Sequence, residues 1–314
     1  MRRTTISSLG LIAILAAACS SAGSSTSPSA PAASASAAAV STAPSVAPSA
    51  TPDACAAANL TLATPGKFTI GTDNPAYPPY FAENADKHMT PPWEIGDPTN
   101  GQGFESAVGY AIADRLGFDK ADVAWIVVPF ANSFAPGPKT FDIDLNQVNY
   151  KTERTQTADL TKGYYFGNQA LVVLKDSPLA KATTIAELKD GLYGAQVGTT
   201  SYDSIASIIA PSKPALVYDT NDLAIKALGN KTIDGVMVDL PTADYITNVQ
   251  VENATIVGQF EGGTPEYFSA VLGKGSTLTP CVDAAIDSLT ADGTLDKLAS
   301  TWLPFQDSVP VIKP

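Results

Sequence analysis

The sequence predicts an α/β fold for most of the chain, on three observations. Short apolar runs of strand length alternate with amphipathic helical patterns, which is typical of sheets covered by helices. Hydrophobic residues make up 45% of the chain, enough for a sizeable core. After an N-terminal region of biased composition, about 260 residues remain, a length that suits one large or two modest domains. We therefore expect the folded α/β part to begin at residue 54.

The first residues are typical of an export signal. A charged start, Met1–Arg3, precedes an apolar stretch, Ile6–Ala18, that is short for a bilayer span and ends in small residues. Together with Cys19 this end is similar to the bacterial lipobox, although Ala16 stands where leucine is usual. We expect residues 1–18 to be a cleaved signal peptide and Cys19 to carry lipid at the cell membrane, outside the cytoplasm. An ordinary secretory signal with an incidental cysteine is the alternative.

The segment after Cys19 is predicted to be a tether. Residues 20–52 are Ser, Ala, Pro, Thr, Gly and Val, without one charged residue. Such a segment has little to bury and cannot offset the entropy of ordering. We expect residues 19–53 to be a disordered leash that keeps the folded part near the membrane.

Composition argues against several classes of function. The formal net charge of −12 and the pI of about 4.4 disfavour nucleic acid, whose phosphates need clustered Lys and Arg. The single histidine, His88, leaves almost no material for a His-rich metal site or a Ser-His-Asp triad, and we expect it in a solvated loop. We predict no catalytic residue, no metal and no cofactor.

Two cysteines remain besides Cys19. Outside the cytoplasm, Cys55 and Cys281 suggest a disulfide between the start of the folded region and a C-terminal helix. Two separate buried thiols are the alternative.

Strands and helices are expected in alternation along the folded part. The predicted strands are Lys67–Asp73, Val123–Pro129, Phe141–Val148, Ala170–Leu174, Tyr193–Val197, Ala215–Tyr218, Gly235–Val238, Thr255–Phe260 and Tyr267–Gly273. The predicted helices are Phe104–Leu116, Thr184–Asp190, Tyr202–Ala210, Asp222–Leu228, Pro241–Val249, Pro280–Ala291 and Thr294–Trp302. The first of these helices places Val108, Ile112 and Leu116 on one face and stops at Gly117.

Four segments, by their order and spacing, carry a resemblance to a known family. They are Gly71–Asp73 with Tyr77–Tyr80, then Gly103–Glu105, then the run from Asp142 to Thr152–Arg154 with Tyr164 and Tyr165, and finally Gly198–Ser201 with Asp234, Gly235 and Asp239. The chain resembles the amino-acid-binding class (family 3) of bacterial extracellular solute-binding proteins, the receptors of ABC importers. The resemblance runs from about Gly66 to Pro304.

The resemblance implies a two-lobed, periplasmic-binding-protein-like fold of type II, with the ligand between the lobes. Lobe one would comprise residues 54–165 and 260–314, and lobe two residues 166–259. Two crossover strands would form the hinge, near Phe166–Ala170 and Thr255–Phe260.

The resemblance also implies partners for an amino acid. Arg154 would bind the carboxylate in bidentate fashion, unless it forms a surface salt bridge. From the opposite lobe, Thr199 and Thr200 would offer hydroxyls and a helix start, or only an N-cap. Asp239 would bind the ammonium, or cap the helix that begins at Pro241.

Further residues complete the implied site. Asn146, Gln147 and Asn149 would line the wall beside the arginine, where the family often has smaller Gly, Ser and Thr. Lys151 would favour an acidic ligand or point to solvent. Tyr77 and Phe130 would sandwich the ligand or belong to the core. Asp73 would add a second negative charge. Trp93, within the long stretch Ala82–Gln102, would be a lid or a surface residue.

The implied function is that of a monomeric substrate-binding lipoprotein. It would close around an amino acid or close analogue and deliver it to a membrane permease. One alternative is a dehydratase-like enzyme on the same scaffold, with Glu105 or Glu153 as acid or base. The other is a sensor subunit that reports the ligand to a membrane receptor.

Overall fold

The computed structural model describes residues 54–261, 266–305 and 308–313. The signal peptide, Cys19 and the tether lie outside these described residues, so the predictions made for them stay predictions. Within the described part, no helix combines the length and the apolar character needed to cross a membrane.

The first of two five-stranded sheets has the order β2-β1-β3-β10-β4. Strand β1 pairs in parallel with β2 and β3, whereas β10 is antiparallel to β3 and β4. All five residues of β1 are buried, which is typical of a parallel strand covered on both faces. The strands are β1 (Phe68–Thr72), β2 (Val123–Val127), β3 (Ile143–Asp144), β4 (Ala158–Gly167) and β10 (Glu266–Gly273).

The second sheet has the order β7-β6-β8-β5-β9. Here β6 pairs in parallel with β7 and β8, and β5 is antiparallel to β8 and β9. Its strands are β5 (Gln169–Leu174), β6 (Tyr193–Gln196), β7 (Leu216–Tyr218), β8 (Gly235–Asp239) and β9 (Ala254–Phe260). Each sheet with its helices is called a lobe below, the first sheet belonging to lobe one and the second to lobe two.

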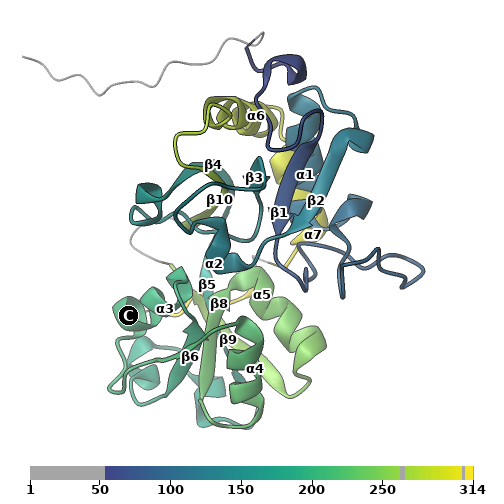
Figure 1. Cartoon of the computed structure of the whole chain (residues 1–314). Coiled ribbons are helices and arrows are strands. Elements are labelled where there is room, and N and C mark those ends of the chain that lie inside the picture. The colour runs from purple at the N-terminus through teal and green to yellow at the C-terminus, as the bar shows by residue number, and fades with distance from the viewer. Residues whose placement is uncertain (1–53, 262–265, 306–307, 314) are drawn as a thin grey trace, which may run out of the picture. The chain divides into compact units, whose positions relative to one another are not determined.

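Each sheet has its own helices (Figure 1). Those of lobe one are α1 (Phe104–Arg115), α2 (Phe130–Ser133), α6 (Thr279–Ala291) and α7 (Thr294–Trp302). Those of lobe two are α3 (Thr200–Ser204), α4 (Asn221–Gly229) and α5 (Leu240–Tyr245), of which α3 and α5 continue as π-helical turns to Ile209 and Gln250. Separate apolar cores fill the lobes, one large cluster in lobe one and two clusters that include the two faces of β5 in lobe two.

Most expected elements form, and helix α1 shows why. Val108, Ile112 and Leu116 are fully buried on one face of it, and the helix ends before Gly117, whose φ of +86° favours glycine. The expected strand at 141–148 is reduced to two residues, and it does not reach Val148 because the chain turns at Gln147, which has a φ of +48°. The helix expected at 184–190 is a single 3₁₀ turn, Ile185–Leu188.

The sequence patterns missed a strand and a short α-helix in lobe one, as well as several 3₁₀ turns. The ten-residue strand β4 contains Lys162 and Gly163, and its pairing with β10 shifts register around Gly163, so no regular alternation marks it. The four-residue helix α2 is too short for a helical period to show.

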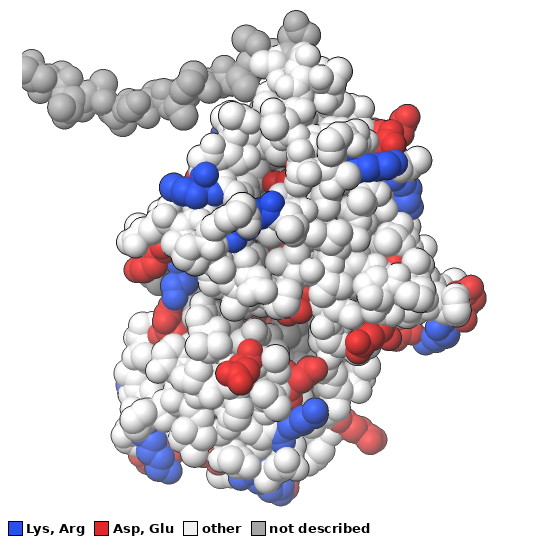
Figure 2. Space-filling view, in the orientation of Figure 1, with Lys and Arg blue, Asp and Glu red and all other residues white. Residues whose placement is uncertain are grey.

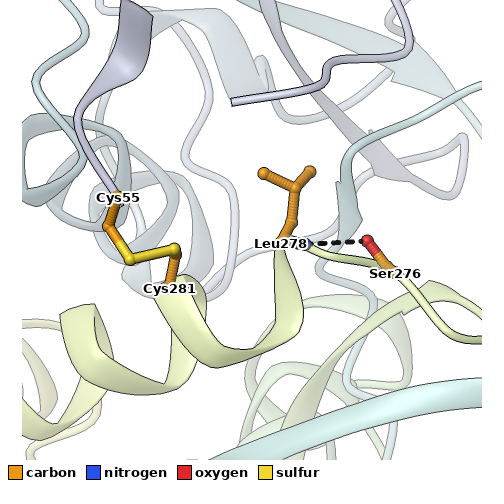
Figure 3. Close-up of a disulfide and its surroundings, with 4 residues drawn as sticks. All are labelled: Cys55, Ser276, Leu278 and Cys281. Carbon is orange, nitrogen blue, oxygen red and sulfur yellow. Dashed lines mark hydrogen bonds between the residues drawn. A yellow bond between two sulfur atoms is a disulfide. The ribbon is translucent and has the colours of Figure 1, made fainter. Parts of the chain in front are cut away.

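Cys55 and Cys281 form the expected disulfide, with 5.3 Å between their Cα atoms. In Figure 3 the bond joins the segment at the start of the described chain to the first turn of α6. Just before that helix, the backbone N–H of Leu278 donates to Ser276 Oγ at 3.2 Å. The bond lies within lobe one and ties together residues 226 positions apart.

The long stretch 82–102 folds against lobe one. Trp93 is buried in the core of that lobe, so it is neither a lid nor a surface residue. The stretch is held together by the Asp97 carboxylate, which accepts hydrogen bonds from Asn84 and Thr99, among others. His88 is exposed, as expected for a loop residue.

The chain passes from lobe one to lobe two at Asn168, between β4 and β5, and returns after Phe260, with residues 262–265 not described. The second expected crossover, 255–260, is instead part of β9 in the second sheet. The last residues also depart from the expected boundaries. Ile312 is buried in a lobe two core, and Val311 pairs with Gln259, so the end of the 260–314 segment belongs to lobe two.

Candidate ligand-binding site

A cavity of about 160 Å³ is lined by residues of both lobes. All ten residues predicted to bind a ligand line it: Asp73, Tyr77, Phe130, Asn146, Gln147, Asn149, Arg154, Thr199, Thr200 and Asp239. In Figure 2 the face of the molecule is hollowed between its upper and lower parts, and acidic side chains lie along the hollow.

The parallel pairing of strands explains why these distant residues meet. Strands β1, β2 and β3 run in one direction, and their carboxyl ends lead into Asp73, Phe130 and Asn146 respectively. In lobe two, β6 leads into Thr199, and parallel β8 ends at Asp239. The crevice at the carboxyl ends of such strands is where α/β sheets bind ligands.

Arg154 is buried and not a surface salt bridge. Its guanidinium donates to the backbone carbonyl of Asn149 and, at 2.8 Å, to that of Gly198 in lobe two. It also lies 4.3 Å from the ring centre of Phe134, a cation–π contact. Burial lowers the pKa of Arg154 to about 10, which leaves the side chain charged at neutral pH.

Asp239 turns its carboxylate into the cleft. Although it precedes α5, its side chain makes no capping hydrogen bond. Instead Oδ1 accepts from Asn149 Nδ2 at 2.9 Å and from Gln169 Nε2 at 2.7 Å. Burial, and secondarily the charge of Glu266, raises the pKa of Asp239 to about 7.

A second acidic group lies elsewhere on the cavity wall. Asp73 accepts from the backbone N–H of Asn74 at 2.8 Å and of Phe130 at 3.3 Å. Burial raises the pKa of Asp73, and the charge of Asp222 from lobe two raises it further. Asp222 also lines the cavity and accepts from Tyr77 Oη at 2.8 Å.

The two threonines have different contacts. Thr199 is the N-cap of α3, since its hydroxyl accepts from the N–H of Tyr202 at 3.2 Å, while it still lines the cavity. Thr200 Oγ1 accepts from Asn149 Nδ2 at 3.0 Å, across the cleft. Thr199 therefore caps helix α3 in addition to lining the cavity, whereas the hydroxyl of Thr200 faces lobe one.

The aromatic pair is placed at the cavity rather than in a main core. Tyr77 lies 5.7 Å from the ring of Tyr245 in lobe two. Phe130 packs edge-on against Phe134 at 5.3 Å and borders only a small apolar cluster around Val148.

Glu105 does not line the cavity, but it holds Gln147, which does. Its buried carboxylate accepts from the backbone N–H of Gln147 at 2.8 Å, from the Gln147 side chain and from Tyr164. Burial raises the pKa of Glu105 to about 7. Glu105 is fully buried, whereas Glu153 is exposed. Neither glutamate lines the cavity, so neither is placed to act as its acid or base.

Lys151 takes neither of its two expected roles. It forms an ion pair with Asp203 of α3 and does not line the cavity. The pair links the two lobes outside the cavity.

Sequence reasoning missed several lining residues of lobe two, namely Gln196, Ser201, Thr220, Asn221, Asp222 and Thr242. Thr220 is the N-cap of α4, accepting from Leu223 N at 3.3 Å, so its polar character is explained by the helix start alone. For three of them, Thr220, Asn221 and Asp222, the available signal was position, since they follow the carboxyl end of β7, which is parallel to β6.

The amino-acid sequence is similar to those of known binding proteins. Residues 69–305 match the family model of bacterial extracellular solute-binding proteins, family 3. The chain is 26% identical over 204 residues to the probable histidine-binding protein of Campylobacter jejuni, covering 64% of this chain and 76% of that protein. It is 28% identical over 225 residues to ABC transporter arginine-binding protein 1 of Escherichia coli strain K12, covering 68% and 87%.

Solved structures show the same fold. An ancestral arginine-binding protein bound to glutamine has a TM-score of 0.61 at 23% identity, covering 76% of this chain and 99% of that one. An ABC uptake transporter substrate-binding protein from Streptococcus pneumoniae with bound histidine has a TM-score of 0.60 at 21% identity, covering 78% and 95%. Since the family model spans most of the chain, this protein belongs to the bacterial extracellular solute-binding proteins of family 3.

Proposed function

We propose that this protein binds a free amino acid in the cleft and delivers it to the permease of an ABC importer. One observation carries the proposal: Arg154 and Asp239, of opposite charge and from different lobes, line the same cavity. A desolvated amino acid needs a partner for its carboxylate and another for its ammonium. The relatives named as histidine- and arginine-binding proteins support this ligand class.

The charges of the cavity favour an amino acid with a cationic side chain. Of the described residues that line it, three are acidic, Asp73, Asp222 and Asp239, and one is basic, Arg154. A zwitterionic ligand balances one carboxylate and the guanidinium, which leaves Asp73 and Asp222 near each other without a cation. A side-chain guanidinium or ammonium between them would relieve that repulsion. We take L-arginine as the first candidate.

Ligand binding would act by closing the lobes. A ligand held by Arg154 from lobe one and by Asp239 from lobe two is bound more tightly by the closed state, so it shifts the population towards closure. We further propose that lipid on Cys19 and the segment 20–52 keep the closed receptor near its permease, since tethering raises the local concentration.

A thermal-shift screen of the purified chain tests the ligand class. Endogenous ligand is first removed, and the common amino acids are added one at a time. A ligand that binds only the native state raises the apparent melting temperature. We expect the largest rise with L-arginine or another basic amino acid, and a smaller one with L-glutamine. No rise with any amino acid would contradict the proposal, and a chemically altered ligand would point to an enzyme.

A further inference from the structure

Asn149 bridges the closed cleft with its side chain. It comes from lobe one, and its Nδ2 donates to two acceptors of lobe two, Thr200 Oγ1 at 3.0 Å and Asp239 Oδ1 at 2.9 Å. The residue is buried, with 5% of its surface exposed. Both N–H groups of the carboxamide therefore have partners on the opposite side of the cavity.

One of the two acceptors of Asn149, Asp239, is the residue that the proposed function assigns to the ammonium of the ligand. Asp239 Oδ1 already receives two donors, Asn149 Nδ2 and Gln169 Nε2. The ammonium of an amino acid would form a hydrogen bond there in which both donor and acceptor are charged, stronger than the bond of a neutral amide to the same carboxylate. The amide of Asn149 thus occupies the ammonium position with a weaker donor.

The backbone of Asn149 contacts Arg154, the residue that we propose binds the carboxylate of the ligand. Its carbonyl oxygen accepts a hydrogen bond from Arg154 Nη1, while Nη2 is bound to the carbonyl of Gly198. One residue therefore presents an N–H donor to Asp239 and a carbonyl oxygen to Arg154. These are the two kinds of group that an amino acid offers through its ammonium and its carboxylate.

We propose that Asn149 is an internal stand-in for the ligand, which holds the empty lobes together and must leave Asp239 when the ligand binds. The proposal rests on the proposed function and names a specificity-determining residue for the same site. This competition disfavours ligands without a positive charge, because a neutral donor gains nothing over the amide that it displaces.

The substitution Asn149→Ser tests the proposal. Serine is too short to reach across the cleft, so the bridge is lost while a polar group remains. Asn146→Ser is the matched control, because Asn146 also lines the cavity but donates within lobe one, to the Val128 carbonyl at 3.2 Å. Small-angle X-ray scattering of the ligand-free proteins measures the separation of the lobes, and calorimetry with L-arginine measures affinity.

For N149S we expect a larger radius of gyration without ligand, the wild-type value with L-arginine bound, and an affinity about tenfold higher, since a bond to a charged group no longer has to be broken. For N146S we expect the wild-type radius of gyration. Unchanged or weaker binding of L-arginine by N149S would overturn the proposal, because the amide would then remain in place or contact the ligand.

A spectroscopic measurement distinguishes this failure from failure of the proposed function. The side-chain amide signals of Asn149 are assigned by their loss in N149S, and they should shift when L-arginine is added to the wild type. Signals that stay in place while L-arginine binds would also overturn the proposal. If the wild type binds no amino acid, the proposed function fails, whereas a larger radius of gyration of N149S would still support the bridge between the empty lobes.

Discussion

Tyr77 of lobe one donates a hydrogen bond to Asp222 of lobe two, with 2.8 Å between Oη and Oδ2, although 145 positions separate them in the chain. Burial, followed by the hydrogen bond to Asp222, raises the pKa of Tyr77, so its hydroxyl stays a donor across the physiological range. The bond marks the region of the cavity where Asp73 and Asp222 come together.

The substitution Asp222→Asn should lower the affinity for L-arginine by about tenfold and leave that for L-glutamine nearly unchanged, because it removes one of the two carboxylates that we propose bind a cationic side chain. Calorimetry with both ligands measures the difference. Asp219→Asn is the control, since Asp219 is exposed three positions earlier and does not line the cavity. An equal loss for both ligands would mean that Asp222 acts by holding the lobes and not by selecting the side chain.

The substitution Arg154→Ala should weaken amino-acid binding by about a hundredfold or more, since it removes the buried cation that we propose as the partner of the ligand carboxylate. Circular dichroism should show the fold intact. Arg115→Ala provides a control for general charge effects, because Arg115 is exposed on α1 and pairs with Asp292 far along the chain. Undiminished affinity of the Arg154 variant would refute the assignment of the carboxylate partner.

The affinity for L-arginine should fall as the pH is lowered through about 7, the value to which burial raises the pKa of Asp239. Below that pH the carboxyl group is protonated and neutral, so it no longer pairs with the ammonium, and the loss approaches tenfold per pH unit. L-Arginine itself does not titrate in this range.

Two variants assign the pH dependence to its source. Asp239→Asn should bind weakly at every pH and lose the dependence. Glu105, whose pKa burial also raises to about 7, does not line the cavity, so Glu105→Gln should keep the slope. If the pH dependence of the affinity disappears in Glu105→Gln, the responsible proton is bound at Glu105 and not at Asp239.

Reduction of the Cys55–Cys281 bond should destabilise the fold without changing the ligand affinity. The bond closes a loop of 226 residues, for which chain entropy gives about 5 kcal/mol at most. Both cysteines belong to lobe one, so opening and closing of the cleft do not strain the bond. Thermal unfolding of the Cys55→Ser, Cys281→Ser double variant should start at a lower temperature, while calorimetry gives the wild-type dissociation constant. A weaker affinity would mean that the bond orders the cavity wall as well.

Local patterns were sufficient for much of the fold. The helical spacing of Val108 and Ile112 predicted α1, and both are buried. The apolar run Ala170–Leu174 lies within strand β5, which is buried because both of its faces are covered. Strand β4 was not predicted because it is formed by pairing with β10, about a hundred positions away, and that pairing is irregular. Trp93 could not be placed, since whether an aromatic residue is buried depends on what the rest of lobe one offers it.

The ten predicted site residues all line one cavity, and the family resemblance is the reason that they could be named. The alternatives attached to them were decided by contacts. Asp239 could have capped α5, but its carboxylate is bound by Asn149 and Gln169 instead. Lys151 could have faced an acidic ligand, but Asp203 pairs with it.

The sequence by itself determined the α/β alternation and left a single histidine for any histidine-based site, because these depend on composition and on spacing along the chain. It suggested the bond between Cys55 and Cys281, which the structure then showed. Only the tertiary structure decided that Asn149 reaches Asp239 and that Asp222 joins Asp73, because hydrogen bonds and repulsion act over a few ångströms in space. Residues ninety or more positions apart acquire such neighbours only when the parallel strands of both lobes end at the same cleft.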